Sequence, residues 1–292
     1  MKYKRTFCKA IYKVSWWHLS ILSDPWFETA NRGQIGYGFA YKYLLKILML
    51  NQIFNEDCLE WMKRIPDWSI DCIITDPPYW STACKWDTVI PLDKMWEQLK
   101  RIIKPNGAIV MTASQPFTSV LVCSNIKMFK YEWVWQKDGG SNFATVKYQP
   151  MKEHESVLIF GNGRVNYYQI KQERVGSRKG KVTKTVDSGR KDSVYGSQKG
   201  GSVFDVPELR CPSSVQRFTR DRGLHPTQKP VALIEYLIRT YTNEWETVLD
   251  FTIGSWTTAI ACMNTNRNYI GFELDKWYFD IANERIKNHI VI

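Results

Sequence analysis

The stretch TVLDFTIGSWTTAIAC, residues 247–262, decides the fold. It opens with a strand-like run that ends in Asp250, turns through a loop around Gly254, and continues into a helix that Ser255 or Thr257 can cap. A capped helix start directs backbone N–H groups at a ligand. About 20 residues beyond the start of the loop, the next strand-like run reaches Glu273, where an acid would bind ribose hydroxyls. The order strand, loop, helix, strand and acid predicts a nucleoside-cofactor site, and a plain glycine turn before a capped helix is the simpler alternative.

The rest of the chain alternates in the same way between strand-like and helix-like patterns. Strands are expected at 52–54, 70–75, 108–112, 131–135, 156–160, 247–250 and 268–273, and helices at 92–103, 231–242, 257–264 and 277–288. Strands that alternate with helices predict an α/β fold with a doubly wound, mostly parallel sheet. The glycine loop carries no P-loop lysine, which argues against nucleoside triphosphate hydrolysis.

A second informative stretch is SIDCIITDPPYW, residues 69–80. A buried strand that ends in Asp76 places this acid at the carboxyl edge of the sheet, where open α/β folds bind ligands. Pro77 and Pro78 fix φ and remove two N–H donors, so the turn can present carbonyl acceptors. Tyr79 adds an aromatic ring. An acid, carbonyl groups and a ring suit a planar substrate that carries an amino group, although an ordinary Pro-Pro turn after a strand is the alternative.

Composition narrows the class of protein. A chain of 292 residues with 44% hydrophobic residues can form one large α/β domain plus a smaller module. No run approaches the roughly 20 apolar residues of a membrane span, and the start lacks a signal-peptide pattern. The seven cysteines form no C-x-x-C pair and the four histidines are scattered, so neither a metal site nor a disulfide framework is expected. These features predict a soluble protein of a reducing cytoplasm.

The positive charge of the chain is concentrated in two segments. The formal net charge is +11, with fourteen Lys and Arg against six Asp and Glu in residues 164–222 and eight against two in residues 1–48. The first of these segments contains VGSRKGKVTKTVDSGRKDSVYGSQKGGS, which shows neither helical nor strand periodicity. A solvated linker is one interpretation. Basic residues interleaved with tyrosines are more typical of a surface that follows a phosphate backbone. The candidate DNA-binding residues are Lys179, Lys181, Lys184, Arg190 and Lys191.

Three motifs occur in a characteristic order: DPPY at 76–79, a variable basic region, and HPTQKP at 225–230 followed by the glycine loop. In this order the chain resembles the β-class DNA amino-methyltransferases of bacteria and their phages, over roughly residues 50–292. The resemblance implies a Rossmann-like fold that binds S-adenosylmethionine. It divides the chain into an extension (1–48), a catalytic half (49–163), a target-recognition insert (164–222) and a cofactor-binding half (223–292).

The resemblance also implies roles for individual residues. The four residues that would hold a flipped base are Asp76, Pro77, Pro78 and Tyr79. The residues that would line the cofactor pocket are Asp57, His225, Thr227, Lys229, Asp250, Gly254, Ser255, Thr257 and Glu273. We interpret His225 as an architectural residue of its motif rather than a base or a metal ligand.

The first residue of DPPY bears on the substrate. Relatives with Ser at this position act on cytosine N4 and those with Asn on protein glutamine, so Asp76 favours adenine N6. A cytosine N4 enzyme and a DNA-binding relative that has lost catalysis remain alternatives. The expected partner is double-stranded DNA, with a homodimer left open, in the cytoplasm of a bacterium or a phage-infected host. A role in restriction-modification fits this family, and the recognition sequence cannot be read from the chain.

Four tryptophans stand where such enzymes commonly carry glycine in a turn. They are Trp68, Trp80, Trp245 and Trp256, the last in GSWTT where relatives usually have GSGTT. One cause would explain all four: a source that reads UGA as glycine, with the sequence translated as if UGA encoded tryptophan. The same misreading could create residues 1–48. The alternative is that the tryptophans are genuine. Under the misreading hypothesis we expect the indole of Trp256 to lie beside the cofactor and obstruct it.

Overall fold

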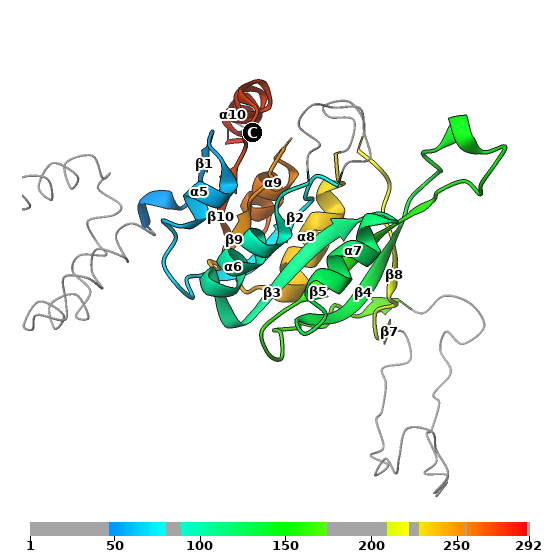
Figure 1. The fold of residues 1–292 in the computed structure, drawn as a ribbon, viewed down its shortest axis with the longest axis horizontal. Coiled ribbons are helices and arrows are strands. Elements are labelled where there is room, and N and C mark those ends of the chain that lie inside the picture. Colours follow the sequence, from blue (N-terminus) through cyan, green and yellow to red (C-terminus); the bar gives the residue numbers. More distant parts are fainter. Residues whose placement is uncertain (1–46, 80–88, 174–208, 222–227, 255, 291–292) are drawn as a thin grey trace, which may run out of the picture.

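A computed structural model describes residues 47–79, 89–173, 209–221, 228–254 and 256–290 (Figure 1). The strands are β1 (Gln52–Phe54), β2 (Ile70–Thr75), β3 (Ile103–Ala113), β4 (Phe129–Gln136), β5 (His154–Phe160), β6 (Gln172–Glu173), β7 (Leu209–Arg210), β8 (Val215–Arg217), β9 (Thr247–Asp250) and β10 (Asn268–Phe272). The helices are α5 (Cys58–Met62), α6 (Leu92–Ile102), α7 (Phe117–Ser124), α8 (Val231–Tyr241), α9 (Thr257–Asn264) and α10 (Lys276–Ile290), with a 3-10 turn η2 at Phe143–Thr145.

One large sheet organises the molecule. Its strand order is β1-β10-β9-β2-β3-β5-β4-β8, and the neighbouring strands from β1 to β3 are all parallel. Strand β5 runs antiparallel to both β3 and β4, whereas β8 pairs parallel with β4. The prediction of a doubly wound, mostly parallel α/β sheet is therefore confirmed.

Helices cover both faces of this sheet, as Figure 1 shows. Side chains of α5, α6 and α7 pack on one face and those of α8, α9 and α10 on the other. Successive side chains of a strand point to opposite faces of the sheet, so each strand contributes to both hydrophobic layers. In β2, Ile73 faces the first group of helices and Ile74 faces the second. Because both faces are covered, the central strands β2 and β9 are buried along their whole length. Within the described residues, no helix has the length and apolarity to cross a membrane.

Most predicted elements lie within one or two residues of their observed bounds, and three differences stand out. Strand β3 begins at Ile103, directly after α6, rather than at Ala108. Helices α5 and α7 were not predicted, because one has five residues and the other shows little amphipathic pattern. Short helices that are buried or capped locally leave a weak periodic signal.

Both ends of the predicted insert pack on the body of the domain. Val165 is buried, and the N–H of Tyr168 donates to the carbonyl of Thr240 at 2.8 Å. The ring of Tyr167 lies 6.3 Å from that of Trp133. At the other end β8 extends the sheet. The five candidate DNA-binding residues at 179–191 lie outside the described residues.

Three of the four unusual tryptophans have a backbone that favours glycine. The φ angles are +52° at Trp68, +66° at Trp245 and +71° at Trp256, whereas Trp80 lies outside the described residues. The five other described tryptophans do not have positive φ. Apart from these three, the described non-glycine residues with positive φ are two asparagines, which tolerate this region well. The turns at 68, 245 and 256 therefore have the geometry that the sequence hypothesis of glycine positions predicts.

Candidate active site

The carboxyl edge of the sheet collects the predicted acids. Asp76 follows β2, Asp250 ends β9, Glu273 follows β10, and Asp57 lies three residues after β1. These four strands are parallel, so their carboxyl ends meet along one edge.

A cavity of about 390 Å³ lies at this edge. Every predicted catalytic or cofactor-binding residue that the structure describes lines it: Asp57, Asp76, Pro77, Pro78, Tyr79, Lys229, Asp250, Gly254, Thr257 and Glu273. The predicted residues His225, Thr227 and Ser255 lie outside the described part of the chain. The fold thus brings the DPPY segment and the glycine loop, which are about 170 residues apart, to one site.

Asp76 is held by two donors from different elements. The hydroxyl of Thr112, near the end of β3, donates to Asp76 Oδ1. The ammonium of Lys229 donates to Asp76 Oδ2 at 2.5 Å and is 7% exposed. Burial raises the pKa of Asp76, and the ammonium of Lys229 offsets part of this rise. Each carboxylate oxygen retains a second acceptor site, so the group can still accept a bond from a ligand in the cavity.

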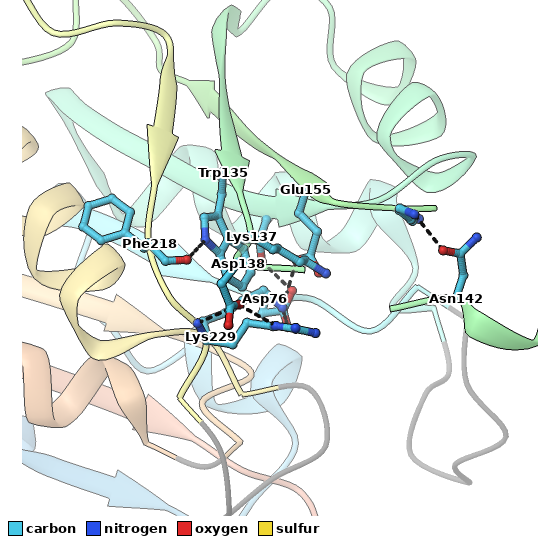
Figure 2. Close-up of polar contacts among 11 residues, drawn as sticks. Asp76, Trp135, Lys137, Asp138, Asn142, Glu155, Phe218 and Lys229 are labelled. Atoms are coloured by element: carbon cyan, nitrogen blue, oxygen red, sulfur yellow. Dashed lines mark hydrogen bonds and ion pairs between the residues drawn. The ribbon is translucent and has the colours of Figure 1, made fainter. Parts of the chain in front are cut away.

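Charged partners continue beyond Lys229 (Figure 2). Lys229 Nζ also lies 3.4 Å from Oε2 of Glu155, and Lys137 Nζ lies 2.5 Å from Oε1 of the same carboxylate. Burial opposes ionisation of Glu155, but the ammonium groups of Lys229 and Lys137 lower its pKa below the usual value. Asp76 and Glu155 in turn raise the pKa of Lys229 against the effect of burial. Neither Glu155 nor Lys137 was predicted as a site residue.

The aromatic ring of the DPPY segment packs on a helix that was not predicted. The rings of Tyr79 and Phe117, the first residue of α7, are stacked with centroids 5.5 Å apart and planes 18° apart. The hydroxyl of Thr252 donates to the backbone carbonyl of Asp76 at 3.2 Å. These contacts fix the turn between β2 and Tyr79 relative to the glycine loop.

The two acids beside the glycine loop accept backbone hydrogen bonds. Glu273 accepts from the N–H of Gly254 at 2.9 Å and from the N–H of Asp275 at 2.8 Å. Asp250 accepts from the hydroxyl of Thr258 at 2.6 Å. Burial raises the pKa of both carboxyl groups, that of Asp250 to about 7.

Two residues that line the cavity carry polar atoms without a partner in the described chain. Within the described residues, Thr257 Oγ1 and Gln228 Oε1 are buried and have no hydrogen-bond partner, and both residues line the cavity. A buried polar atom of this kind is costly unless a ligand or water satisfies it. At the other end of the cavity, Asp57 caps α5 by accepting from the N–H of Leu59 at 2.8 Å.

Two expectations about the glycine loop need correction. Thr257 is the first residue of α9 rather than its cap; the cap position is Trp256, which makes no side-chain capping bond. The indole of Trp256 also does not line the cavity, contrary to the expectation that it would obstruct a cofactor. Its positive φ turns the side chain into the core between α9 and α10, where it is 1% exposed and its ring lies 6.4 Å from that of Phe279.

Comparison with known proteins identifies the family. A model of the N6/N4 DNA methylase family matches residues 70–284, which include both the DPPY segment and the glycine loop. The chain belongs to this family. Its membership confirms the resemblance to DNA amino-methyltransferases drawn from the order of the three motifs.

Relatives and solved structures agree with this assignment. The chain is 28% identical over 252 residues to the type II methyltransferase M.HpaI of Haemophilus parainfluenzae, covering 82% of this chain and 74% of that protein. It is 28% identical over 250 residues to the DNA adenine methyltransferase YhdJ of Escherichia coli (strain K12), covering 80% of this chain and 82% of that protein. A crystal structure of an M1.HpyAVI–SAM complex is similar at 25% identity with a TM-score of 0.54, covering 80% of this chain and 98% of that one.

Proposed function

We propose that this DNA methylase transfers the methyl group of S-adenosylmethionine to N6 of an adenine that is flipped out of double-stranded DNA. One observation carries the proposal: Asp76 and Tyr79 line the same cavity as the acids and the loop expected to bind the cofactor. A relative named as a DNA adenine methyltransferase supports adenine as the substrate, and so does Asp rather than Ser at position 76.

The residues of the cavity suit S-adenosylmethionine. Glu273 follows β10, where an acid can bind the ribose hydroxyls. Thr257 Oγ1, at the start of α9, and Gln228 Oε1 are buried polar atoms without a partner in the described chain, as expected of groups that a polar cofactor completes. The similar solved structure of the M1.HpyAVI–SAM complex supports this choice of cofactor. When bound, the cofactor supplies an electrophilic methyl group on a sulfonium.

The DPPY segment supplies what the base requires. The lone pair of adenine N6 is delocalised into the ring, so a site that favours a pyramidal nitrogen lowers the barrier. Asp76 and the carbonyl of Pro77 can accept the two N–H bonds, which turns the lone pair toward the methyl group. The amino group loses one proton as the N–C bond forms, and Asp76 is the nearest carboxylate acceptor. Tyr79, supported by Phe117, can stack on the base and offset part of the unstacking cost of a few kcal/mol.

DNA outside the cavity would be bound by the basic insert. Its five candidate residues between Lys179 and Lys191 carry positive charge that can follow a phosphate backbone. We also propose that the enzyme acts in the cytoplasm of a bacterium or a phage-infected host, as a modification methyltransferase.

A labelled-methyl transfer assay tests the proposed function. The protein is incubated with double-stranded DNA and S-adenosylmethionine labelled at the methyl group, and the DNA is then digested to nucleosides. Labelled N6-methyl-2′-deoxyadenosine is expected. Labelled N4-methyl-2′-deoxycytidine would identify the enzyme as the cytosine type, and no transfer in the presence of DNA binding would identify a relative that has lost catalysis.

A further inference from the structure

A row of alternating charges runs from Asp76 through Lys229, which also lines the cavity, and Glu155 to Lys137. We propose that Lys229 is a positioning residue, which together with Thr112 holds the carboxylate of Asp76 ionised and aimed at the substrate amino group, with Glu155 as the second counter-charge of Lys229. The proposal rests on the proposed function, because it assigns a task to the residues behind the catalytic acid. It gives Lys229 a role other than the cofactor contact expected from its motif.

The contacts of Asp76 form a two-point clamp. Thr112 donates to one carboxylate oxygen and Lys229 to the other, so the side chain cannot rotate without losing a bond. The donors come from β3, which pairs with β2, and from the segment directly before α8. Asp76 is 24% exposed, whereas Lys229 is 7% exposed. The clamp therefore leaves part of the carboxylate accessible from the cavity, which Thr112 and Lys229 also line.

Glu155 anchors the ammonium of Lys229 from the opposite side. Its Oε2 lies 3.4 Å from Nζ of Lys229, a charge contact longer than the 2.5 Å bond from Lys229 to Asp76. Strand β5 is antiparallel to β3, so its first residues reach the carboxyl edge where Asp76 lies. The ammonium of Lys229 remains charged although it is buried, because it lies beside two carboxylates. Removal of either carboxylate would leave a buried charge that is less well compensated. Lys137, 7% exposed, neutralises the outer oxygen of Glu155.

The electrostatic effects on Asp76 have opposite signs. Burial raises its pKa, Lys229 lowers it, and Glu155 raises it. Two further ionisable groups in these surroundings are Lys137, which pairs with Glu155, and Asp250 at the end of β9, whose pKa the charge of Asp76 helps to raise. The Tyr79 hydroxyl is a third, and it is neutral over the pH range of the test. A protonated Asp76 would present an O–H donor to an amino group that needs acceptors. Lys229 thus preserves the acceptor, whereas the like charge of Glu155 works against the ionisation of Asp76.

The test measures the ionisation of Asp76 directly. Aspartate carboxyl carbons are labelled with ¹³C in the full chain, Asp76→Asn identifies the resonance of Asp76, and the resonance is followed from pH 3 to pH 9. Lys229→Gln should raise the titration midpoint of Asp76 by about 1–3 pH units, because an adjacent cation shifts a carboxyl by this amount. Glu155→Gln should lower the midpoint, because it removes a like charge.

Lys104→Gln is the matched control. Lys104 pairs with Asp71 at the opposite end of β2, so this variant removes the same charge without touching the clamp. Its midpoint for Asp76 should equal that of the parent. Opposite shifts in the Lys229 and Glu155 variants support the proposal; unchanged midpoints, or shifts of the same sign, overturn it. If Lys229→Gln does not fold, Thr112→Val decides instead: it removes the other donor of the clamp and should raise the midpoint, and an unchanged midpoint overturns the proposal. No turnover is needed, so an inactive parent would refute the proposed function without affecting this result.

Discussion

The tryptophans at positive φ give a quantitative prediction about stability. Trp68 and Trp245 are 65% and 68% exposed, so their indoles can be removed without opening the core. At each position we compare two variants, Trp→Gly and Trp→Ala. Both delete the indole, so their difference reports only the backbone preference of the turn.

The expected sign follows from the φ angles of +52° and +66°. A left-handed conformation costs a residue with a Cβ atom about 1–2 kcal/mol. Glycine avoids this cost but loses about 0.4–1 kcal/mol more than alanine in chain entropy on folding. The net result favours glycine by about 1 kcal/mol at each of the two positions. Trp256, at +71°, should show the same preference for glycine over alanine, although both variants would leave the space that its buried indole fills.

Trp277 provides the matched control. It is 62% exposed and lies in α10, where φ is not positive. Glycine should therefore be less stable than alanine there, by about 0.5–1 kcal/mol. Urea unfolding followed by far-UV circular dichroism measures all six variants at positions 68, 245 and 277 without relying on tryptophan fluorescence. Alanine variants as stable as the glycine variants at both 68 and 245 would refute the reasoning.

The origin of these residues is a separate question, which the coding sequence answers. If UGA was read as tryptophan in place of glycine, positions 68, 80, 245 and 256 should all be encoded by UGA. UGG at these positions would show that the tryptophans are genuine and that the protein tolerates them in strained turns.

Three further predictions concern DNA binding, the extension and pH. Neutralising Lys179, Lys181 and Lys184 together should weaken DNA binding and reduce its salt dependence by up to about three phosphate contacts; an unchanged slope would place the DNA surface elsewhere. A chain that starts at Met49, which is buried in the core, should fold and keep the activity of the full chain, and aggregation would show that the extension belongs to the core. Burial raises the pKa of Asp250 to about 7, so the folded state favours the protonated carboxyl. The resulting contribution to the free energy of unfolding is full below about pH 4 and is lost as pH rises through 7. Asp250→Asn should therefore gain stability relative to the parent by up to about 4 kcal/mol between pH 4 and pH 8 in urea titrations, and a constant difference would contradict the raised pKa.

The sequence predicted the parts of the fold that have a strong local signal. β2 is a run rich in strand-forming residues and was predicted with its observed bounds, as were β9 and α9. The acids at the ends of the parallel strands followed from the same reasoning, because a strand that ends in an acid places it at the carboxyl edge.

The residues behind Asp76 could not be predicted, because they depend on strand order. Glu155 is the second residue of a strand that looks like any other apolar strand, and only the antiparallel insertion of β5 between β3 and β4 brings it to Lys229. Phe117 belongs to a helix with little amphipathic signal, so its stacking on Tyr79 was also unforeseen. The burial of Trp256 was missed for a related reason: the direction of a side chain at positive φ is set by the turn and not by residue type.

We propose that Asp76 acts on the substrate amino group and not on DNA binding. Methyl transfer and DNA affinity are measured in parallel for the parent and for Asp76→Ala, by labelled-methyl transfer and by gel shift. Asp76→Asn, in which Lys229 keeps Glu155 as its counter-charge, guards against a folding defect. In Asp76→Ala we expect the rate of methyl transfer to fall by at least about 100-fold, while the dissociation constant for DNA stays nearly unchanged. An equal loss of transfer and binding, or transfer that survives the substitution, would contradict it.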